Sequence, residues 1–304
     1  MSRNIPASVR QRLRDLARRR NEDFGLVLTK YGLERVLFRL GRSKHRDSFV
    51  LKGALLFELW TKERHRPTRD VDFLAYGPND LDRFIGIFRE ICSDVFEEDG
   101  LTFDVEAIDG ERIKEDADYE GIRFQFVAYL GNIRIPIQID IGFGDVVTPA
   151  ALQVEYPTLL NLPAPVLSAY PRETVVAEKC EAMVKLGMAN SRMKDFHDLS
   201  SLAGQFGFDG AILGHAIAET FVRRKTDIPV PPPTALTVEF YEDKSKRQQW
   251  TAFTQRNRLH MEPRELSEVV AEVAAFLMPV LESLADNRSF TATWSPGGPW
   301  AECR

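Results

Sequence analysis

Two aspartates one residue apart, Asp70 and Asp72, are the sharpest chemical feature of this 304-residue sequence. They lie in RDVDFLAY, an alternating stretch that predicts a short β-strand, and side chains at positions i and i+2 of a strand point to the same face. Two carboxylates this close repel each other unless a cation lies between them, and hard oxygen ligands suit Mg²⁺. The pair therefore indicates a metal site. A solvated strand end is the alternative for an isolated pair.

A third carboxylate, Asp140, could complete that site. It lies in IRIPIQIDIGFGD, where isoleucines at alternate positions predict an apolar strand face, and Arg134, Gln138 and Asp140 share the other face. A neighbouring strand would bring Asp140 beside the first pair, and a hydrated strand residue is the alternative. Pro136 has no N–H group, so it restricts this strand locally to a sheet edge or a bulge.

Phosphate-binding groups are predicted just upstream of the pair. The segment FVLKGALLFELW (residues 49–60) predicts a helix that is opened by Lys52, Gly53 and Ala54. Backbone N–H groups at a helix start bind phosphate, and glycine permits a close approach. A basic turn then leads into the carboxylates, with three arginines at Arg64, Arg66 and Arg69.

A lysine and two aspartates in the C-terminal half form a second candidate cluster. Lys179 lies on a predicted helix, and Asp195 and Asp198 lie three residues apart on one face of the next predicted helix. For Lys179 the alternative is a surface ion pair with Glu178, which stabilises little. The aspartates could instead be helix-surface charges, or partners of the basic residues just ahead of them, Arg192 and Lys194.

Hydrophobic spacing predicts the elements that position these residues. Helical spacing covers residues 7–20, 22–40, 81–95, 172–224, 236–256 and 264–286, and alternation with period two covers 102–108, 122–130 and 133–143. The proline-rich stretch 227–233 is the clearest break. We expect an α+β chain with a basic helical N-terminal segment at 1–48 packed on the core, a core at 49–170 and a mainly helical domain at 171–304. The irregular tail of that domain carries two tryptophans, so we expect it to pack back on the body.

Composition excludes several classes of protein. The chain is 44% hydrophobic and 28% charged, unlike a disordered chain or a collagen-like repeat. Three widely spaced cysteines, Cys92, Cys180 and Cys303, argue against a disulfide framework and indicate a reducing cytosol. The N-terminus has no apolar signal region, and no window reaches about 18 uninterrupted apolar residues. We therefore expect a cytoplasmic protein without a membrane partner.

The net charge of −5 conceals an uneven distribution. Residues 1–50 carry 13 Lys and Arg against 5 Asp and Glu, a net of +8, so the other residues sum to −13. A basic head on an acidic body can mark a surface that binds a polyanion. This head is the best candidate for an RNA-facing surface, with a solvated amphipathic helix as the alternative. The acids between residues 79 and 120 are expected on the solvated surface.

The order of these features resembles the nucleotidyltransferase fold of the DNA polymerase β superfamily. Longer strings make the resemblance more specific: FVLKGALLFELW with HRPTRDVDFL, IQIDIGFGD, and AEKCEAMVKLGMANSRMKDFHDL. Together they look like the AbiEii family of nucleotidyltransferase toxins, to which the mycobacterial MenT toxins are related. YGLERVLFRLGRS and TWSPGGPW also look familial, so the resemblance covers nearly the whole chain. It implies an α+β fold with a polymerase β-like core, a mixed sheet flanked by helices.

The resemblance also implies roles for individual residues. Asp70, Asp72 and Asp140 would be the metal ligands, and Lys179 would meet the triphosphate. The final motif falls on Asp195 or Asp198, and Asp195 is favoured because it follows basic residues. The implied catalytic set is therefore Asp70, Asp72, Asp140, Lys179 and Asp195.

The implied nucleotide-binding set surrounds these residues. It consists of Lys52, Gly53, Ala54, Arg66, Thr68, Lys179, Arg192, Lys194 and Asp198. Members of the superfamily often place serine or a second glycine after the first glycine. This chain has Ala54 there, so backbone N–H groups would carry that phosphate contact alone.

The activity implied by the resemblance is transfer of a nucleotide from an NTP to an acceptor, with Mg²⁺ or alternatively Mn²⁺ as cofactor. The implied acceptor is RNA, in particular the 3′ end of a tRNA, whose modification would block translation. The protein would then be the toxin of a bacterial toxin–antitoxin system used in phage defence, with an AbiEi-like antitoxin from a neighbouring gene. Two alternatives stay open: an enzyme of this fold that modifies a protein or a small molecule, and a GTP-binding regulator without turnover.

Overall fold

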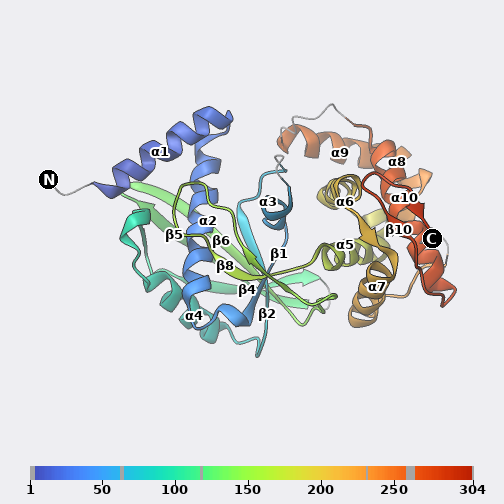
Figure 1. The fold of residues 1–304 in the computed structure, drawn as a ribbon, viewed down its shortest axis with the longest axis horizontal. Helices are drawn as coiled ribbons and strands as arrows, with labels where there is room; N and C mark the ends of the chain where they lie inside the picture. Colours follow the sequence, from blue (N-terminus) through green and yellow to red (C-terminus); the bar gives the residue numbers. More distant parts are fainter. Residues whose placement is uncertain (1–3, 62–64, 117–118, 231, 258–263, 303–304) are drawn as a thin grey trace. The chain divides into compact units, whose positions relative to one another are not determined.

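The computed structural model describes residues 4–61, 65–116, 119–230, 232–257 and 264–302, apart from the side chains of 114–120. Arg64 and Cys303 lie outside these ranges. The chain divides into two compact units, Met1–Gly144 with Leu152–Ala169 and Asp145–Ala151 with Tyr170–Arg304. In Figure 1 the first unit is mainly blue and green, and the second is mainly yellow to red.

The first unit is built on an eight-stranded mixed sheet. Its strands are β1 (Phe49–Lys52), β2 (Asp70–Ala75), β3 (Leu101–Phe103), β4 (Asp109–Asp116), β5 (Tyr119–Leu130), β6 (Ile133–Phe143), β7 (Leu152–Glu155) and β8 (Val166–Ala169). Their order is β3-β5-β6-β2-β1-β8-β7, and β4 pairs with β5. β2 runs parallel to β6, and β1 runs parallel to β8. The predicted α+β fold with a mixed sheet flanked by helices is confirmed.

The helices of this unit are α1 (Ile5–Arg20), α2 (Phe24–Arg42), α3 (Leu56–Trp60) and α4 (Leu81–Ser93), with 3₁₀ turns at Arg46–Ser48 and Glu97–Asp99. α2 packs on the isoleucine face of β6, where a side chain at Gly32 would meet Ile135 and Ile137. α4 places Phe84 and Phe88 against Phe49 of β1, with ring centroids 5.9 and 5.8 Å away. Because successive strand residues alternate, the polar residues of β2 and β6 lie on the opposite face.

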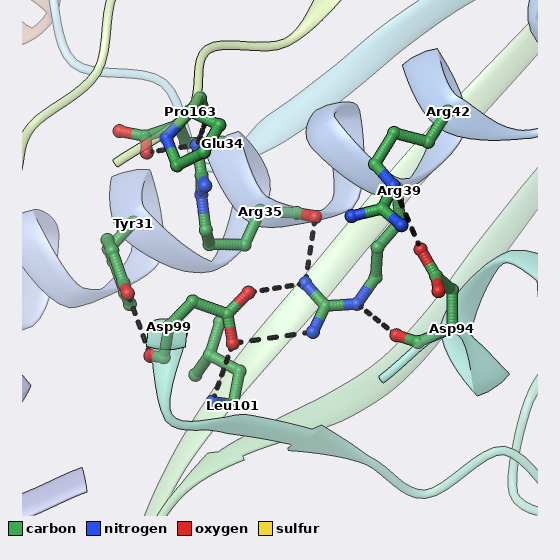
Figure 2. A network of polar contacts seen from close by, with 9 residues as sticks. All are labelled: Tyr31, Glu34, Arg35, Arg39, Arg42, Asp94, Asp99, Leu101 and Pro163. Carbon is green, nitrogen blue, oxygen red and sulfur yellow. Dashed lines mark hydrogen bonds and ion pairs between the residues drawn. The ribbon is translucent and has the colours of Figure 1, made fainter. Parts of the chain in front are cut away.

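Charged groups are buried where α2 meets the chain around Asp99. Arg39 is 1% exposed, and its guanidinium donates to the Asp99 carboxylate at 2.6 and 3.3 Å and to the Asp94 carbonyl at 2.9 Å (Figure 2). Asp99 also accepts from the N–H of Leu101. Full hydrogen bonding makes such a buried pair tolerable. Asp99 therefore departs from the expectation of solvated acids in 79–120, and Arg39 contributes no surface charge.

The second unit is mainly helical, as shown in Figure 1. Its helices are α5 (Arg172–Leu186), α6 (Met193–Gln205), α7 (Gly210–Arg224), α8 (Val238–Glu242), α9 (Lys244–Asn257) and α10 (Leu266–Ala285), with 3₁₀ turns at Gly187–Ala189 and Thr234–Leu236. A small sheet joins β9 (Phe208–Asp209), β10 (Thr293–Trp294) and β11 (Trp300–Ala301). In the described part of the chain, no helix is long and apolar enough to cross a membrane.

The C-terminal tail packs on this unit, as predicted. Trp294 is 4% exposed, and its indole N–H donates to the Ala203 carbonyl at 2.7 Å. Trp300 stacks on Phe276 with ring centroids 5.8 Å apart, and its N–H donates to the Phe276 carbonyl. Trp294 is thus buried and Trp300 half-buried, and the N–H group of each has a hydrogen-bond partner.

The prediction of one helix over residues 49–60 is wrong. Residues Phe49–Lys52 form strand β1, Gly53 turns with φ 76°, and the helix α3 begins only at Leu56. All four residues of β1 are buried, and the strand lies inside the sheet, between β2 and β8. A strand buried on both faces shows no alternation, so a short apolar run cannot be told from a helix by its spacing. Lys52, Gly53 and Ala54 thus form a strand-to-helix turn and do not open a helix.

Two further predicted elements are shorter than expected. The strand predicted at 102–108 ends at Phe103, and the helix predicted over 236–256 is divided into α8 and α9 at Asp243. The Asp243 carboxylate accepts from the N–H groups of Ser245 and Lys246, which starts α9 as a new helix. The predicted helix boundaries at α1, α2 and α4 differ from those observed by only a few residues.

Candidate active site

Strand β2 brings Asp70 and Asp72 to one face of the sheet. Val71 lies between the two aspartates and Phe73 follows Asp72. Both apolar residues are fully buried, whereas the two aspartates are half-buried. The apolar residues are held in the core, so the pleat of the strand sends both carboxylates to the other side. The Thr68 hydroxyl donates to the Asp70 carboxylate and fixes its orientation.

Strand β6 adds the third carboxylate beside this pair. β6 lies parallel to β2, and the register places Asp140 directly across from Asp72. Asp70, Asp72 and Asp140 each offer a carboxylate oxygen, and these oxygens lie within 4.8 Å of one another. Three converging carboxylates are the hard oxygen donors that Mg²⁺ prefers. The donor set therefore fits a divalent cation, and the structure brings together the three residues that the sequence singled out.

Pro136 also has the position that its chemistry requires. It lies on β6 opposite Val127 of β5, whereas the pairing of β6 with β2 begins only at Gln138. The described strand β2 therefore makes no ladder bond at Pro136, so the missing N–H group costs nothing on that side. Pro136 therefore lies where β6 is locally at an edge toward β2, as the sequence predicted.

The turn after β1 closes the site from another side. Lys52, the last residue of β1, is buried and pairs in register with Asp72. At Gly53, which has φ 76°, a Cβ atom would overlap the Asp72 carboxylate. Only glycine combines this conformation with this approach. Ala54 is buried and Arg66 is half-buried.

Arg123 of β5 is a site residue that the sequence reasoning missed. Its guanidinium donates from Nε to Asp140 Oδ1 at 2.8 Å and from Nη2 to Oδ2 at 2.7 Å. This hydrogen bonding raises the pKa of Arg123 above its ordinary value. Bidentate hydrogen bonding of this kind fixes the plane of the carboxylate as well as its position.

The sequence did carry a signal for Arg123. β5 and β6 are joined by two residues, Gly131 and Asn132, and the pair Leu130 and Ile133 closes the hairpin. Counting outward from a two-residue turn fixes the register of both strands. That register places Arg123 opposite Asp140.

The second cluster lies in the second unit. The Lys179 amine donates to Asp195 Oδ1 at 2.6 Å and to Asp198 Oδ2 at 2.8 Å, and both aspartates are fully buried. Arg192 contacts the other oxygen of Asp195 at 2.6 Å. Burial by itself would raise the pKa of Asp195, but the positive charges of Lys179 and Arg192 lower it below its ordinary value.

This arrangement decides between the alternatives for the second cluster. Asp195 and Asp198 are not surface charges, and Lys179 binds both of them across two helices, α5 and α6. Asp195 pairs with Arg192, one of the two basic partners that the sequence suggested. The other, Lys194, is exposed. Buried carboxylates are stabilised by such paired, hydrogen-bonded cations.

The model of one protein family, described as "Nucleotidyl transferase AbiEii toxin, Type IV TA system", matches residues 35–272. The match covers both clusters. The chain belongs to this family. The predicted family is thus confirmed, and the AbiEii chain is a nucleotidyl transferase toxin of a toxin–antitoxin system. Family membership implies an NTP as substrate and an antitoxin as partner.

Solved structures add a comparison of the AbiEii chain with two Helicobacter pylori proteins. One is JHP933, with 12% identity and a TM-score of 0.49, covering 88% of this chain and 95% of that chain. The other, named as a candidate nucleotidyltransferase, has 13% identity and a TM-score of 0.48, covering 88% of this chain and all of that chain. No curated protein matches the sequence.

Proposed function

We propose that this AbiEii-family chain transfers a nucleotide from an NTP to the 3′ end of a tRNA and thereby blocks translation. In this reaction the acceptor hydroxyl loses its proton to solvent, its oxygen forms a bond to the α-phosphorus, the bond between that phosphorus and the β-phosphate oxygen breaks, and pyrophosphate leaves. The observation that carries the proposal is the convergence of Asp70, Asp72 and Asp140. The family match supplies the reaction class. The RNA acceptor comes from the family resemblance and from the basic head of the chain.

In this proposal Asp70 and Asp72 hold Mg²⁺, or Mn²⁺ in its place, at the triphosphate, and Asp140 completes the ligand set. The bound ion would offset the phosphate charge and stabilise the in-line displacement. Thr68 orients Asp70 through its hydroxyl. Two N–H groups of Arg123 already donate to the two oxygens of Asp140, so a ligand role suits Asp140 better than uptake of the hydroxyl proton.

Positive charge for the triphosphate would come from a separate set of residues. We assign this role to Lys179, with Arg66 and Arg192, because cations stabilise the charge that grows on a leaving pyrophosphate. Asp195 and Asp198 hold the Lys179 amine in place. Lys52 and Lys194 belong to the same proposed nucleotide-binding set, together with the backbone of Gly53 and Ala54.

Incubation of the purified chain with each labelled NTP, total tRNA and a lysate tests the proposal. We expect label on tRNA, and we expect Asp70→Asn to reduce it by about 100-fold or more, because the metal loses a ligand. Asp82→Asn is the matched control, since Asp82 is exposed on α4. It should label tRNA like the wild type.

The same experiment separates the alternatives. Label on a protein or a small molecule, with none on tRNA, would reject the tRNA acceptor but keep the transferase. Toxicity that survives Asp70→Asn, without label on any acceptor, would favour a GTP-binding regulator. Co-expression with the neighbouring AbiEi-like protein, followed by co-purification, would show whether the antitoxin binds this chain directly.

A further inference from the structure

Helix α1 presents a dense row of arginines to solvent. Six of its 16 residues are exposed arginines: Arg10, Arg12, Arg14, Arg18, Arg19 and Arg20. Among the described residues none of them forms an ion pair, and the one acidic residue of the helix, Asp15, accepts a hydrogen bond from Gln11. The helix therefore carries a net charge of +5 on its free surface.

The other described cations of the basic head all have acidic partners, some buried and some on the surface. Arg35 and Arg39 are 0% and 1% exposed, and Arg39 is bonded to Asp99. Lys30 bonds Glu58 at 2.8 Å. The charge of +8 counted over residues 1–50 thus has two parts, and only the part on α1 is free of acidic partners among the residues described.

The arginines on α1 are arranged as a stripe. Arg10, Arg14 and Arg18 follow one another at i, i+4 and i+8, so they line one side of the helix at intervals of about 6 Å. Like charges at this spacing destabilise a helix by a few tenths of a kcal/mol per pair. Arg18 is also in the last turn, where the helix dipole compensates. Arg14 has the Phe24 ring as an internal partner, 5.3 Å from its guanidinium, whereas Arg10 has no such compensation among the described residues, which points to an external anion.

The apolar side of α1 is already occupied. Val9, Leu13, Leu16 and Ala17 are buried, and Pro6 abuts Gly100 and Gly131 of the same unit. A helix that inserts into a membrane surface needs a free apolar face. α1 has none, so its free surface is suited to a polar, charged partner. Figure 1 shows it beside the start of α2, at the margin of the first unit.

The charge of the remaining chain favours RNA as that partner. Outside residues 1–50 the chain sums to −13, so a polyanion is repelled elsewhere and attracted to the basic head. All six exposed cations on α1 are arginines, whose planar fork binds phosphate through two N–H groups. The α1 helix also lies ahead of the segment that the family model matches, residues 35–272.

We propose that α1 is the docking surface for the acceptor RNA, which it binds through the phosphate backbone with Arg10, Arg14 and Arg18. This inference rests on the proposed RNA acceptor. It adds a second site of RNA contact to the site of the three carboxylates. Helix α1 and the three carboxylates belong to the same compact unit. Binding through phosphates is independent of sequence and sensitive to salt, so α1 would set affinity and orientation while the carboxylates act on the 3′ end.

The test compares two triple variants of the full chain. One is Arg10→Gln, Arg14→Gln, Arg18→Gln. The matched control removes three exposed cations of α9 that form no ion pair among the described residues: Lys244→Gln, Arg247→Gln, Arg256→Gln. Glutamine keeps a helix propensity close to that of arginine, so α1 should stay folded, as circular dichroism will show. A triple replacement by lysine in α1 keeps the charge.

Three quantities are measured for each variant. They are the dissociation constant for unfractionated tRNA at several salt concentrations, the labelling of tRNA, and the binding of a fluorescent NTP. The α1 glutamine variant should bind tRNA at least 10-fold more weakly, and the slope of log Kd against log salt should fall by about two to three. NTP binding should not change. The lysine variant should keep most of the binding, and the α9 control should resemble the wild type.

Other results would overturn the inference. Equal losses in the α1 variant and the α9 control would mean that net charge alone matters. Normal tRNA labelling by the α1 glutamine variant would remove α1 from the reaction while leaving the proposed function intact. Loss of binding to the antitoxin, with tRNA binding unchanged, would identify an acidic protein as the partner. A wild-type chain that neither binds nor labels RNA would instead refute the proposed acceptor itself.

Discussion

The α-carbon of Gly53 lies so close to the Asp72 carboxylate that no side chain fits between them. Its positive φ adds a second reason for glycine, since side chains disfavour that conformation. The turn after β1 and the carboxylate on β2 are therefore mutually dependent. A residue that carries no chemical group of its own controls the position of one that does.

Replacing Gly53 with alanine tests this dependence. We expect Gly53→Ala to displace Asp72, to lower nucleotide transfer by about 10-fold or more, and to weaken Mn²⁺ binding measured by calorimetry. Gly86→Ala on α4 is the control, because a Cβ at Gly86 meets nothing within 4 Å. That change should leave transfer unaltered and raise stability by about 1 kcal/mol, as expected for alanine in a helix. Full activity of Gly53→Ala would refute the dependence.

Arg123 is the other residue whose removal is informative. Arg123→Gln should lower the kcat of transfer by about 10- to 100-fold with little change in KM for the NTP, because Asp140 loses the group that orients it. Arg123→Lys should recover only part of the rate, since an amine cannot make both bonds in one plane. Arg134→Gln, at an exposed position of β6, is the control. An unchanged kcat for Arg123→Gln would show that Asp140 does not depend on Arg123.

The sequence indicated the three carboxylates because their signals are local. The spacing of Asp70 and Asp72 and the alternation around Asp140 each follow from the period of a strand. Arg123 needed the register of two strands at once, which depends on the length of a turn. The bonds from Lys179 to Asp195 and Asp198 join two helices, α5 and α6, and no local pattern records their packing.

At the scale of elements, helix α2 supports the sheet with an unusually polar buried side. Glu34 and Arg35 are 2% and 0% exposed and contact each other at 2.8 Å. Glu34 also accepts from the N–H of Leu159 at 2.6 Å. Arg35 donates to the Pro163 carbonyl at 2.9 Å (Figure 2). Burial raises the pKa of Glu34 to about 7.

This raised pKa predicts how stability depends on pH. Folded Glu34 holds its proton up to a pKa of about 7, whereas the unfolded side chain loses it near 4.5. The folded state binds more protons between these values, so Glu34 lowers the stability of the protein as pH rises from 4.5 to 7. Glu34→Gln removes this slope. The free energy of unfolding of the variant, relative to the wild type, should rise by about 3 kcal/mol over this range.

Urea denaturation of both proteins at several pH values measures this difference. Any fixed cost of leaving Arg35 without its carboxylate cancels, because only the change with pH is compared. A difference that stays constant from pH 4.5 to 8 would mean that Glu34 titrates as it does in the unfolded chain.

Elements were predictable where one face of each is solvated. α1, α4 and β6 show clear periods because polar and apolar residues alternate with the geometry of each element. β1 was mistaken for a helix because all four of its residues are buried, so its sequence shows no alternation. The break at Asp243 was missed because it depends on a single capping side chain inside an otherwise helical pattern.

At the scale of the whole molecule, the chain passes between its two units more than once. Residues Asp145–Ala151 belong to the second unit, although the strands on either side belong to the first. Asp145 is held there by Arg224, at 3.0 Å, and Arg224 also bonds Glu181. Such an excursion cannot be inferred from the composition of the chain. The division of charge was visible in the sequence, but its split into buried and exposed arginines required the fold.

The register between β2 and β6 has a consequence for how this chain can change in evolution. Asp72 faces Asp140 across a parallel pair, and both alternate with fully buried neighbours. Deleting one residue within β2 would turn its carboxylates toward the core. Substitutions that keep the spacing are therefore tolerated in these two strands more readily than the insertion or deletion of a single residue.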